Sequence, residues 1–269
     1  LRRHNKYVVL GAFGMDYYWV HECITRLPLR YSDFNIGKHV RTDEESQRYI
    51  RDWVGTAKGD WCQYVAKDAD KIIAGLYEYW ACYQPNFPEK TVFCPFPIIP
   101  SHTTYRPFDG KLHLFIGINK TRNRYKGTDI MLKAAQKIVE NYPEKADLQV
   151  AESVPFEDYV KMMAKSDVIL DQLYSYTPSM NPLEAMSQGL ICVGGGEPEN
   201  YDIINEYELR PIINVELNES SVYQALYELI LHPERINTLK RESMAYIKRH
   251  HDYINVAQKY IAFYEQLDH

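Results

Sequence analysis

The chain has 269 residues, of which 45% are apolar and 25% charged, and a formal net charge of −5, as expected for an ordinary globular protein. Lysines and arginines are dispersed, which disfavours a nucleic-acid partner, and no apolar run reaches the ~18 residues of a transmembrane helix. The five cysteines form no C-x-x-C pair, which indicates reduced thiols in a cytoplasmic protein and disfavours a metal site. A weakly basic patch that contacts a membrane stays open as an alternative.

The first hundred residues have an irregular pattern of short apolar runs and polar stretches. The expected elements are a buried strand at 7–11, a short helix within 15–30, an amphipathic helix at 43–55 capped by Asp43, a short strand or helix end at 61–65, an apolar segment within 70–79 and a strand at 91–96. Since the chain opens directly on a core strand, we expect that earlier elements of this domain are missing.

Prolines crowd the stretch that follows, at positions 95, 97, 100 and 107. Proline fixes one backbone dihedral and lacks an N–H donor, so 95–110 is expected to be a semi-rigid connector between two domains. The predicted divisions are 1–100, an incomplete α/β domain; 101–250, a complete α/β domain; and 251–269, a C-terminal helix that returns towards the first domain.

From residue 111 onward, strands and helices alternate. Strands are expected at 112–117, 148–150, 167–173, 190–193 and 212–215, and helices at 128–141, 156–165, 182–188, 220–231 and 233–266, the last with a bend near 250–251. This alternation predicts an α/β fold with a parallel sheet and helices on both faces. Ligands of such sheets bind at the carboxyl ends of the strands, so the loops there are the first candidates for a site.

The loop after the strand at 112–117 is basic and leads into a helix. Four of the nine positions from 120 to 128 are cationic: Lys120, Arg122, Arg124 and Lys126. Cations beside the free N–H groups of a helix N-terminus can hold a phosphate. A solvated basic loop is the alternative for this stretch taken alone.

The stretch SYTPSMNPLEAMSQGLICVGGG, residues 175–196, contains one acidic residue, Glu184. With Asn181 as the N-cap and Pro182 as the first helical residue, Glu184 falls at the third helical position, where its carboxylate would reach back to the cap N–H. The same placement would let Glu184 accept hydrogen bonds from the vicinal hydroxyls of a ribose. The residues alone leave both interpretations open.

Three glycines, Gly194, Gly195 and Gly196, follow the strand at 190–193. Glycines at a strand end let the backbone approach a ligand closely, and a flexible turn is the alternative. The three loops follow strands of one predicted sheet, so together they indicate a pocket for a diphosphate flanked by a ribose. Gly117, at the end of the first of these strands, and Tyr176 are assigned to the same pocket.

Four segments resemble retaining, metal-independent glycosyltransferases of the GT-B fold, of the family 4 or group 1 type that builds bacterial surface polysaccharides. The segments are LHLFIGINKTRNRYKGTDIMLKA, MMAKSDVILDQL, NPLEAMSQGLICVGGGEPE and HPERINTLKRESMAYIKRHHDY, and the resemblance covers about residues 92–266. It implies two Rossmann-like domains, an incomplete N-terminal one and a complete C-terminal one that binds the nucleotide sugar.

The resemblance also implies roles for single residues. Lys126 matches a lysine that holds the donor diphosphate, with Arg122 or Arg124 as its partner. Glu184 matches a glutamate that holds the nucleotide ribose. The backbone turn that meets the distal phosphate is formed by Ser179, Met180 and Asn181.

Two positions depart from the family pattern. Tyr176 stands eight positions before the ribose glutamate, where relatives carry another glutamate that contacts the transferred sugar. The segment GAFGMD matches the HGxD strand end of relatives at Gly14 and Asp16 but has Phe13 in place of the histidine. No counterpart of the glycine-rich acceptor loop occurs, so an inactive fragment is among the expectations.

The function implied is transfer of a sugar from a nucleotide diphosphate sugar to a hydroxyl of a glycan or lipid-linked acceptor, with retention and with no cofactor or metal. Lysine, arginine and a helix dipole would neutralise the leaving diphosphate. Such an enzyme would act in the cytoplasm, with peripheral association at the inner face of the membrane as an option. The alternatives are a non-catalytic nucleotide-sugar-binding module and a nucleotide-sugar epimerase of the same fold.

Overall fold

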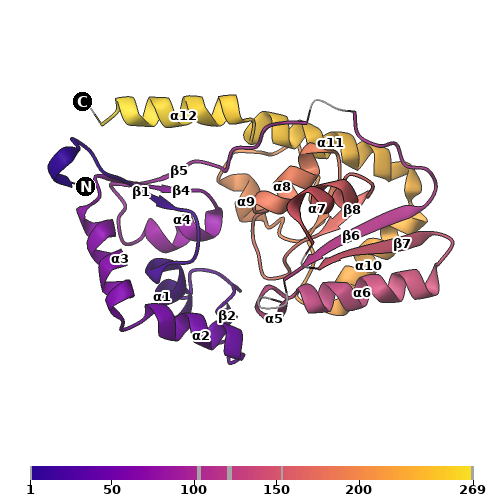
Figure 1. Ribbon diagram of the computed structural model, residues 1–269, viewed down its shortest axis with the longest axis horizontal. Coiled ribbons are helices and arrows are strands. Elements are labelled where there is room, and N and C mark those ends of the chain that lie inside the picture. The colour runs from indigo at the N-terminus through magenta and orange to yellow at the C-terminus, as the bar shows by residue number, and fades with distance from the viewer. Residues whose placement is uncertain (1, 102–103, 120–122, 153, 268–269) are drawn as a thin grey trace. The chain divides into compact units, whose positions relative to one another are not determined.

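The computed structural model describes residues 2–101, 104–119, 123–152 and 154–267 (Figure 1). The chain divides into two compact units: unit 1 comprises Leu1–Phe96 and Ile254–His269, and unit 2 comprises Pro97–Tyr253. Among the described residues, none of the helices combines the length and the apolar character that crossing a bilayer requires.

Unit 1 is built on a three-stranded parallel sheet in the order β1-β4-β5. Its strands are β1 (Val9–Ala12), β4 (Lys71–Ala74) and β5 (Thr91–Phe93), with a separate antiparallel pair, β2 (Asn35–Ile36) and β3 (His39–Val40). Its helices are η1 (Arg2–His4), α1 (Tyr17–Thr25), α2 (Glu44–Trp53), α3 (Ala57–Asp68), α4 (Tyr77–Tyr83) and α12 (Tyr253–Glu265).

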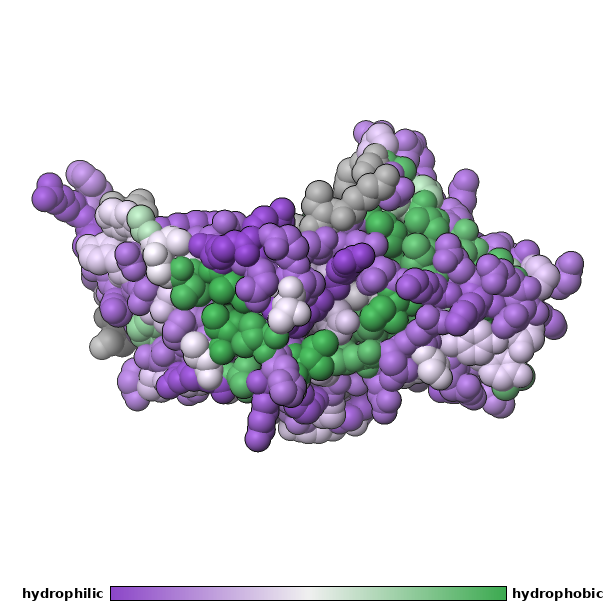
Figure 2. Space-filling model, turned by 90° about the horizontal axis from the view of Figure 1, so that it is seen from below, coloured by the Kyte–Doolittle hydropathy of each residue, from purple (hydrophilic) through white to green (hydrophobic). Residues whose placement is uncertain are grey.

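Side chains of β4 alternate between the two faces of this sheet. Ile72 and Ala74 pack with residues of α1, α3 and α4, whereas Ile73 points to the other face and packs with Cys94 and with Val256 of α12. Figure 2 shows hydrophobic residues gathered on the face of unit 1 that is seen from below. The sheet of unit 1 is therefore covered by helices on both faces.

Unit 2 holds a four-stranded parallel sheet in the order β7-β6-β8-β9. Its strands are β6 (Leu112–Ile118), β7 (Ala146–Glu152), β8 (Val168–Leu170) and β9 (Ile191–Val193). Its helices are α5 (Asn123–Lys126), α6 (Thr128–Asn141), α7 (Phe156–Met163), α8 (Met180–Ser187), α9 (Pro198–Asp202), α10 (Glu219–Leu231), η2 (Pro233–Arg235) and α11 (Ile236–His250).

The order of these strands creates a topological switch point at β6. The first crossover leads from β6 to β7 on one side, and the next strand, β8, pairs with the opposite edge of β6. The connections on the two sides of β6 consequently diverge at the carboxyl ends of the strands. In open α/β sheets a crevice forms at this place, and ligands bind there.

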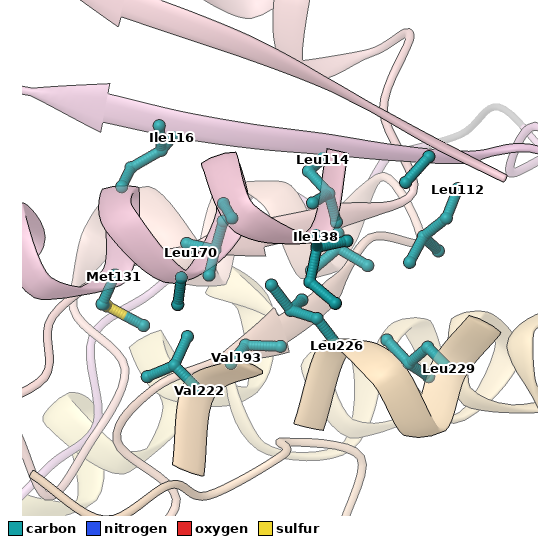
Figure 3. Packing of buried hydrophobic residues seen from close by; sticks show 14 of the residues in the cluster. Leu112, Leu114, Ile116, Met131, Ile138, Leu170, Val193, Val222, Leu226 and Leu229 are labelled. Carbon is teal, nitrogen blue, oxygen red and sulfur yellow. The ribbon is translucent and has the colours of Figure 1, made fainter. Parts of the chain in front are cut away.

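The core of unit 2 lies on one face of its sheet, beneath α6 and α10 (Figure 3). Leu114 and Ile116 of β6 pack there with Ile138 of α6 and Leu226 of α10. On the opposite face Phe115 contacts Tyr159 of α7 edge-on, with ring centroids 5.0 Å apart, and α8 and α11 contact β9. The predicted α/β fold, with a parallel sheet and helices on both faces, is confirmed.

Two strand predictions, at 212–215 and for the length of 167–173, are wrong, and of the two alternatives at 61–65, a short strand or a helix end, the structure has a helix. Residues 61–65 lie inside α3, whose cap Thr56 accepts a hydrogen bond from the Gly59 N–H, and the exposure of Trp61 and Tyr64 on this helix obscured its periodicity. Residues 212–215 do not form a strand. They contribute an isolated bridge between Ile213 and Val193, the last residue of β9. The strand predicted at 167–173 ends at residue 170, so residues 171–173 belong to the loop at the carboxyl end.

Candidate functional site

A cavity of about 400 Å³ opens at the carboxyl ends of β6, β7 and β8 in unit 2. Its walls come from the ends of these strands and from the starts of the segments that follow. The polar residues and glycine that line it are Gly117, Asn119, Lys126, Thr128, Tyr159, Asp171, Gln172 and Asn181. Its volume falls in the range of small-molecule sites, and its position is that of the switch point at β6.

The turn between α5 and α6 positions Lys126 in the wall of this cavity. Gly127 follows with φ of 72°, the left-handed conformation that favours glycine, and a Cβ there would lie 2.7 Å from Cβ of Leu173. The Leu173 N–H donates to the Lys126 carbonyl at 3.0 Å. Because Gly127 caps α6 without a side chain, a cation and the positive end of a helix dipole meet at this wall.

Asp171 supplies a carboxylate to the same cavity. It follows β8 directly, and its N–H donates to the Val193 carbonyl at 3.3 Å. Burial raises the pKa of its carboxyl group, while the charge of Lys126 and hydrogen bonds from Gln172 act in the opposite direction. Burial and the nearby Asp171 charge also raise the pKa of Tyr159 to about 12. Lys126, Tyr159 and Asp171 all line this cavity, which is why their charges influence one another.

The start of α8 borders the cavity as well. Ser179 is its N-cap, in extended conformation and with no hydrogen bond from its side chain to the helix. The Ser179 hydroxyl instead accepts a hydrogen bond from Nε2 of Gln172, at 3.4 Å. Asn181, the second helical residue, lines the cavity.

The capping box predicted for Glu184 is wrong. Because α8 begins at Met180, Glu184 is the fifth helical residue, and its carboxylate accepts a hydrogen bond from Nε2 of Gln188 at 3.0 Å. Pro182 misled the assignment, since a proline fits anywhere in the first turn, where no N–H has an intrahelical partner. Glu184 is not among the residues that line the cavity, and its contact with a ribose stays a prediction.

Gly194, Gly195 and Gly196 are buried and have a structural reason for lacking side chains. A Cβ at Gly195 would lie 2.4 Å from the Ser175 carbonyl oxygen, and one at Gly196 would lie 2.7 Å from Cγ2 of Ile212. Tyr176 is also buried, with 1% of its surface exposed. These four residues do not line the cavity, so their role in ligand binding stays a prediction.

The remaining predicted residues lie outside the cavity wall or outside the described residues. Arg122 belongs to the stretch 120–122, which the structure does not describe. Arg124 and Met180 are exposed at the surface of α5 and α8. Three lining residues, Asp171, Gln172 and Tyr159, were not predicted. Asp171 and Gln172 were not considered because residues 171–173 were expected to continue a strand. The change from apolar to polar residues after Leu170 was the available signal.

The motif at the end of β1 has a structural explanation within unit 1. Asp16 is the N-cap of α1: its Oδ1 accepts from the Trp19 N–H at 2.9 Å and its Oδ2 from the Tyr83 hydroxyl at 2.8 Å. Burial raises the pKa of Asp16 to about 6. Phe13 is 45% exposed and contacts the Phe96 ring edge-on.

The cavity combines groups for two parts of a ligand. Lys126 and the first turns of α6 and α8 could hold an anion such as phosphate. The Asp171 carboxylate could accept hydrogen bonds from neutral donors such as hydroxyls. Among the residues that the structure describes, no three His, Cys, Asp or Glu side chains come together as metal ligands.

Comparisons with known proteins give likeness in structure alone. No protein-family model matches the chain. No curated protein matches it in sequence. One solved structure that it resembles is S. aureus TarM, crystallised as a G117R mutant with fondaparinux, alpha-GlcNAc-glycerol and UDP, with a TM-score of 0.58, 11% identity and coverage of 77% of this chain and 46% of that one. Another is Anabaena HepE with UDP and glucose, with a TM-score of 0.61, 13% identity and coverage of 96% of this chain and 71% of that one.

A third is WaaG, a glycosyltransferase involved in lipopolysaccharide biosynthesis, with a TM-score of 0.58, 13% identity and coverage of 90% of this chain and 80% of that one. The chain spans less than half the length of TarM. At these identities the likeness shows the fold: the chain has α/β architecture of the GT-B type.

Proposed function

We propose that the chain binds a nucleotide diphosphate sugar in the cavity of unit 2 and transfers the sugar to a hydroxyl of a glycan or lipid-linked acceptor. The observation that carries this proposal is Lys126 beside the start of α6, where the cap residue Gly127 offers no side-chain acceptor, at the switch point of the sheet. Solved structures of the same fold add support, since TarM and HepE were crystallised with UDP and WaaG is a glycosyltransferase.

The chemistry of the proposed transfer is the breaking of the bond between the anomeric carbon and the diphosphate oxygen. Negative charge then develops on the leaving diphosphate, where Lys126 and the α6 dipole would stabilise it. The acceptor oxygen would form the new bond on the same face of the sugar, giving retention, and its proton would pass to the leaving phosphate. Stabilisation by protein cations makes the proposed reaction independent of a divalent metal.

Further roles belong to the same proposal. Arg122 or Arg124 would assist Lys126, and Glu184 would hold the ribose. We place the activity in the cytoplasm, at the inner face of the membrane where a lipid-linked acceptor would lie, with surface polysaccharide synthesis as its setting.

A nucleotide-sugar-binding module without catalytic activity is the second candidate. It is favoured by Tyr176, which is buried where related enzymes have a sugar-contacting acid, and by Phe13 in place of a histidine. Hydrolysis or transfer assays on the protein with bound nucleotide sugar separate the two candidates, because only the enzyme releases nucleotide diphosphate.

The test of the site is titration calorimetry with UDP-glucose and GDP-mannose. Lys126→Ala is expected to weaken the binding of whichever donor binds by about 10- to 100-fold, the loss expected for a hydrogen bond to a charged group. Lys133→Ala, which removes an exposed lysine from α6, is the matched control and should bind like the wild type. Equal affinity of the Lys126 and Lys133 variants would place the diphosphate elsewhere.

A further inference from the structure

The cavity of unit 2 contains one carboxylate among its described lining residues, that of Asp171. This residue is held in place by its position in the sheet, directly after β8 and with its N–H bonded to the carbonyl of Val193 on β9. Phosphate ligands make a carboxylate at this place unexpected, since like charges repel. Asp171 therefore needs a different part of the ligand as its partner.

The second charge in the cavity narrows the choice of partner. Lys126 lines the same cavity and would repel a cationic ligand group, as Asp171 would repel a phosphate. A ligand that fits both charges carries an anionic part for Lys126 and neutral hydrogen-bond donors for the carboxylate. Sugar phosphates have this chemistry, because hydroxyl groups lie beside the phosphate.

Other residues at this site are committed elsewhere. Tyr176 is 1% exposed and outside the cavity wall, and Glu184 accepts its hydrogen bond from Gln188. Gln172 donates to the Ser179 hydroxyl and to the Asp171 carboxylate, whose two oxygens keep further lone pairs for a ligand. Tyr159 lines the cavity next to Gly117, where an added Cβ would lie 2.8 Å from the tyrosine hydroxyl oxygen. Among the described lining residues, Asp171 is thus the acid whose carboxylate can accept hydrogen bonds from ligand hydroxyls.

We propose that Asp171 is a donor-selecting residue, whose carboxylate accepts hydrogen bonds from hydroxyl groups of the bound nucleotide sugar while Lys126 holds its phosphate. The hydroxyls belong either to the ribose or to the transferred sugar, and the two sources share the same chemistry. The inference rests on the proposed function and deepens it. It assigns hydroxyl recognition to the loop after β8 rather than to position 176.

The experiment compares Asp171→Asn, which keeps the shape of the side chain, with Asp147→Asn, which alters a partly exposed carboxylate at the amino end of β7. Calorimetry would measure the binding of UDP, UDP-glucose, GDP and GDP-mannose, and of the 2′-deoxy form of UDP or GDP. The Asp171 variant should bind UDP-glucose or GDP-mannose at least ten-fold more weakly than the wild type. The Asp147 variant should bind like the wild type.

The pattern of losses identifies the hydroxyls. If Asp171→Asn weakens the binding of the free nucleotide and of the nucleotide sugar equally, and the variant loses no further affinity when the 2′-hydroxyl is removed, Asp171 contacts the ribose. Weakening confined to the nucleotide sugar assigns it to the transferred sugar. Should Asp171→Asn fold poorly, Asp171→Glu is measured in its place, because it keeps the charge but moves the carboxylate. Affinities within two-fold of the wild type for every probe would then contradict the role of Asp171.

Two results would overturn the proposal in different ways. If the Asp171 variant binds every probe within two-fold of the wild type while Lys126→Ala weakens binding, the role of Asp171 is wrong and the proposed function stands. If the wild type binds none of the probes, the proposed function fails and the donor-selecting role fails with it.

Discussion

Two carboxylates flank β8, and they have opposite environments. Asp167 precedes the strand and is fully buried: its Oδ1 accepts from Nζ of Lys240 at 2.5 Å, and its Oδ2 from Nη2 of Arg106 at 2.9 Å and from the His113 N–H at 3.0 Å. Asp171 follows the strand and faces the cavity, with Lys126 nearby but, within the described residues, in no ion pair with it.

The difference separates a charge network inside the protein from charges that line a cavity. At the amino edge the Asp167 carboxylate is bonded to Lys240 and Arg106 of the same chain. At the carboxyl edge Lys126 and Asp171 line one cavity, and the described residues show no ion pair between them. Charges that the protein does not pair internally are available to a ligand, and this is the physical basis of the proposed function.

The largest effect is expected at the amino edge. Asp167→Asn would leave Lys240, which is 1% exposed, without its counter-charge. Breaking a buried pair in this way costs about 3–5 kcal/mol. Denaturant unfolding would measure the loss.

The matched control for this prediction is Lys137→Ala, which removes a 59% exposed lysine paired with Glu219. A surface pair of this kind contributes roughly 0–1 kcal/mol. An Asp167→Asn loss as small as that of the control would show that the network at the amino edge is not stabilising.

A smaller loss is expected for Gly127→Ala. Alanine in a left-handed conformation costs about 1–2 kcal/mol, and its Cβ would also meet Leu173. Gly110→Ala is the control, because Gly110 also has positive φ but its Cβ would have no neighbour within 4 Å. A larger drop in Tm for Gly127→Ala, together with weaker nucleotide binding, would link the turn to the site; equal drops would show that backbone strain alone matters.

The smallest effect has the opposite sign. Burial raises the pKa of Asp171, so at neutral pH the folded protein bears the cost of desolvating its charge. Asp171→Asn should therefore raise the Tm of the ligand-free protein, by roughly 2–4 °C for each kcal/mol regained. As the pH falls through the folded pKa, the wild-type carboxyl is protonated and the advantage of the variant should shrink. A lower Tm for the variant at neutral pH would instead mark Asp171 as a stabilising residue like Asp167.

The sequence predicted most of unit 2 because its apolar periodicity is regular. The helix expected at 128–141 has these same bounds. In unit 1, Asp43 caps α2 as expected by accepting a hydrogen bond from the Ser46 N–H. The strand β4 was seen only as an apolar segment, since four residues are too short to separate strand from helix.

The site was less predictable, because it depends on which loops the sheet brings together. Lys126, Gly117 and Asn181 were predicted and do line one cavity. Asp171 was overlooked because the change from apolar to polar residues after Leu170 was not taken as the end of the strand. The start of α8 was misplaced for a similar reason. The cap is Ser179, and the sequence offers several nearby polar residues that could equally have served as caps, so the helical position of Glu184 could not be predicted.

The central claim, that the carboxyl edge of the unit 2 sheet binds a nucleotide sugar through Lys126, is tested most directly by ligand-induced stabilisation. UDP-glucose or GDP-mannose at about 100 times its dissociation constant should stabilise the wild type by ~2.7 kcal/mol. At the same concentration Lys126→Ala should be stabilised less and Lys133→Ala equally. Equal stabilisation of all three proteins, or of none, would contradict the account.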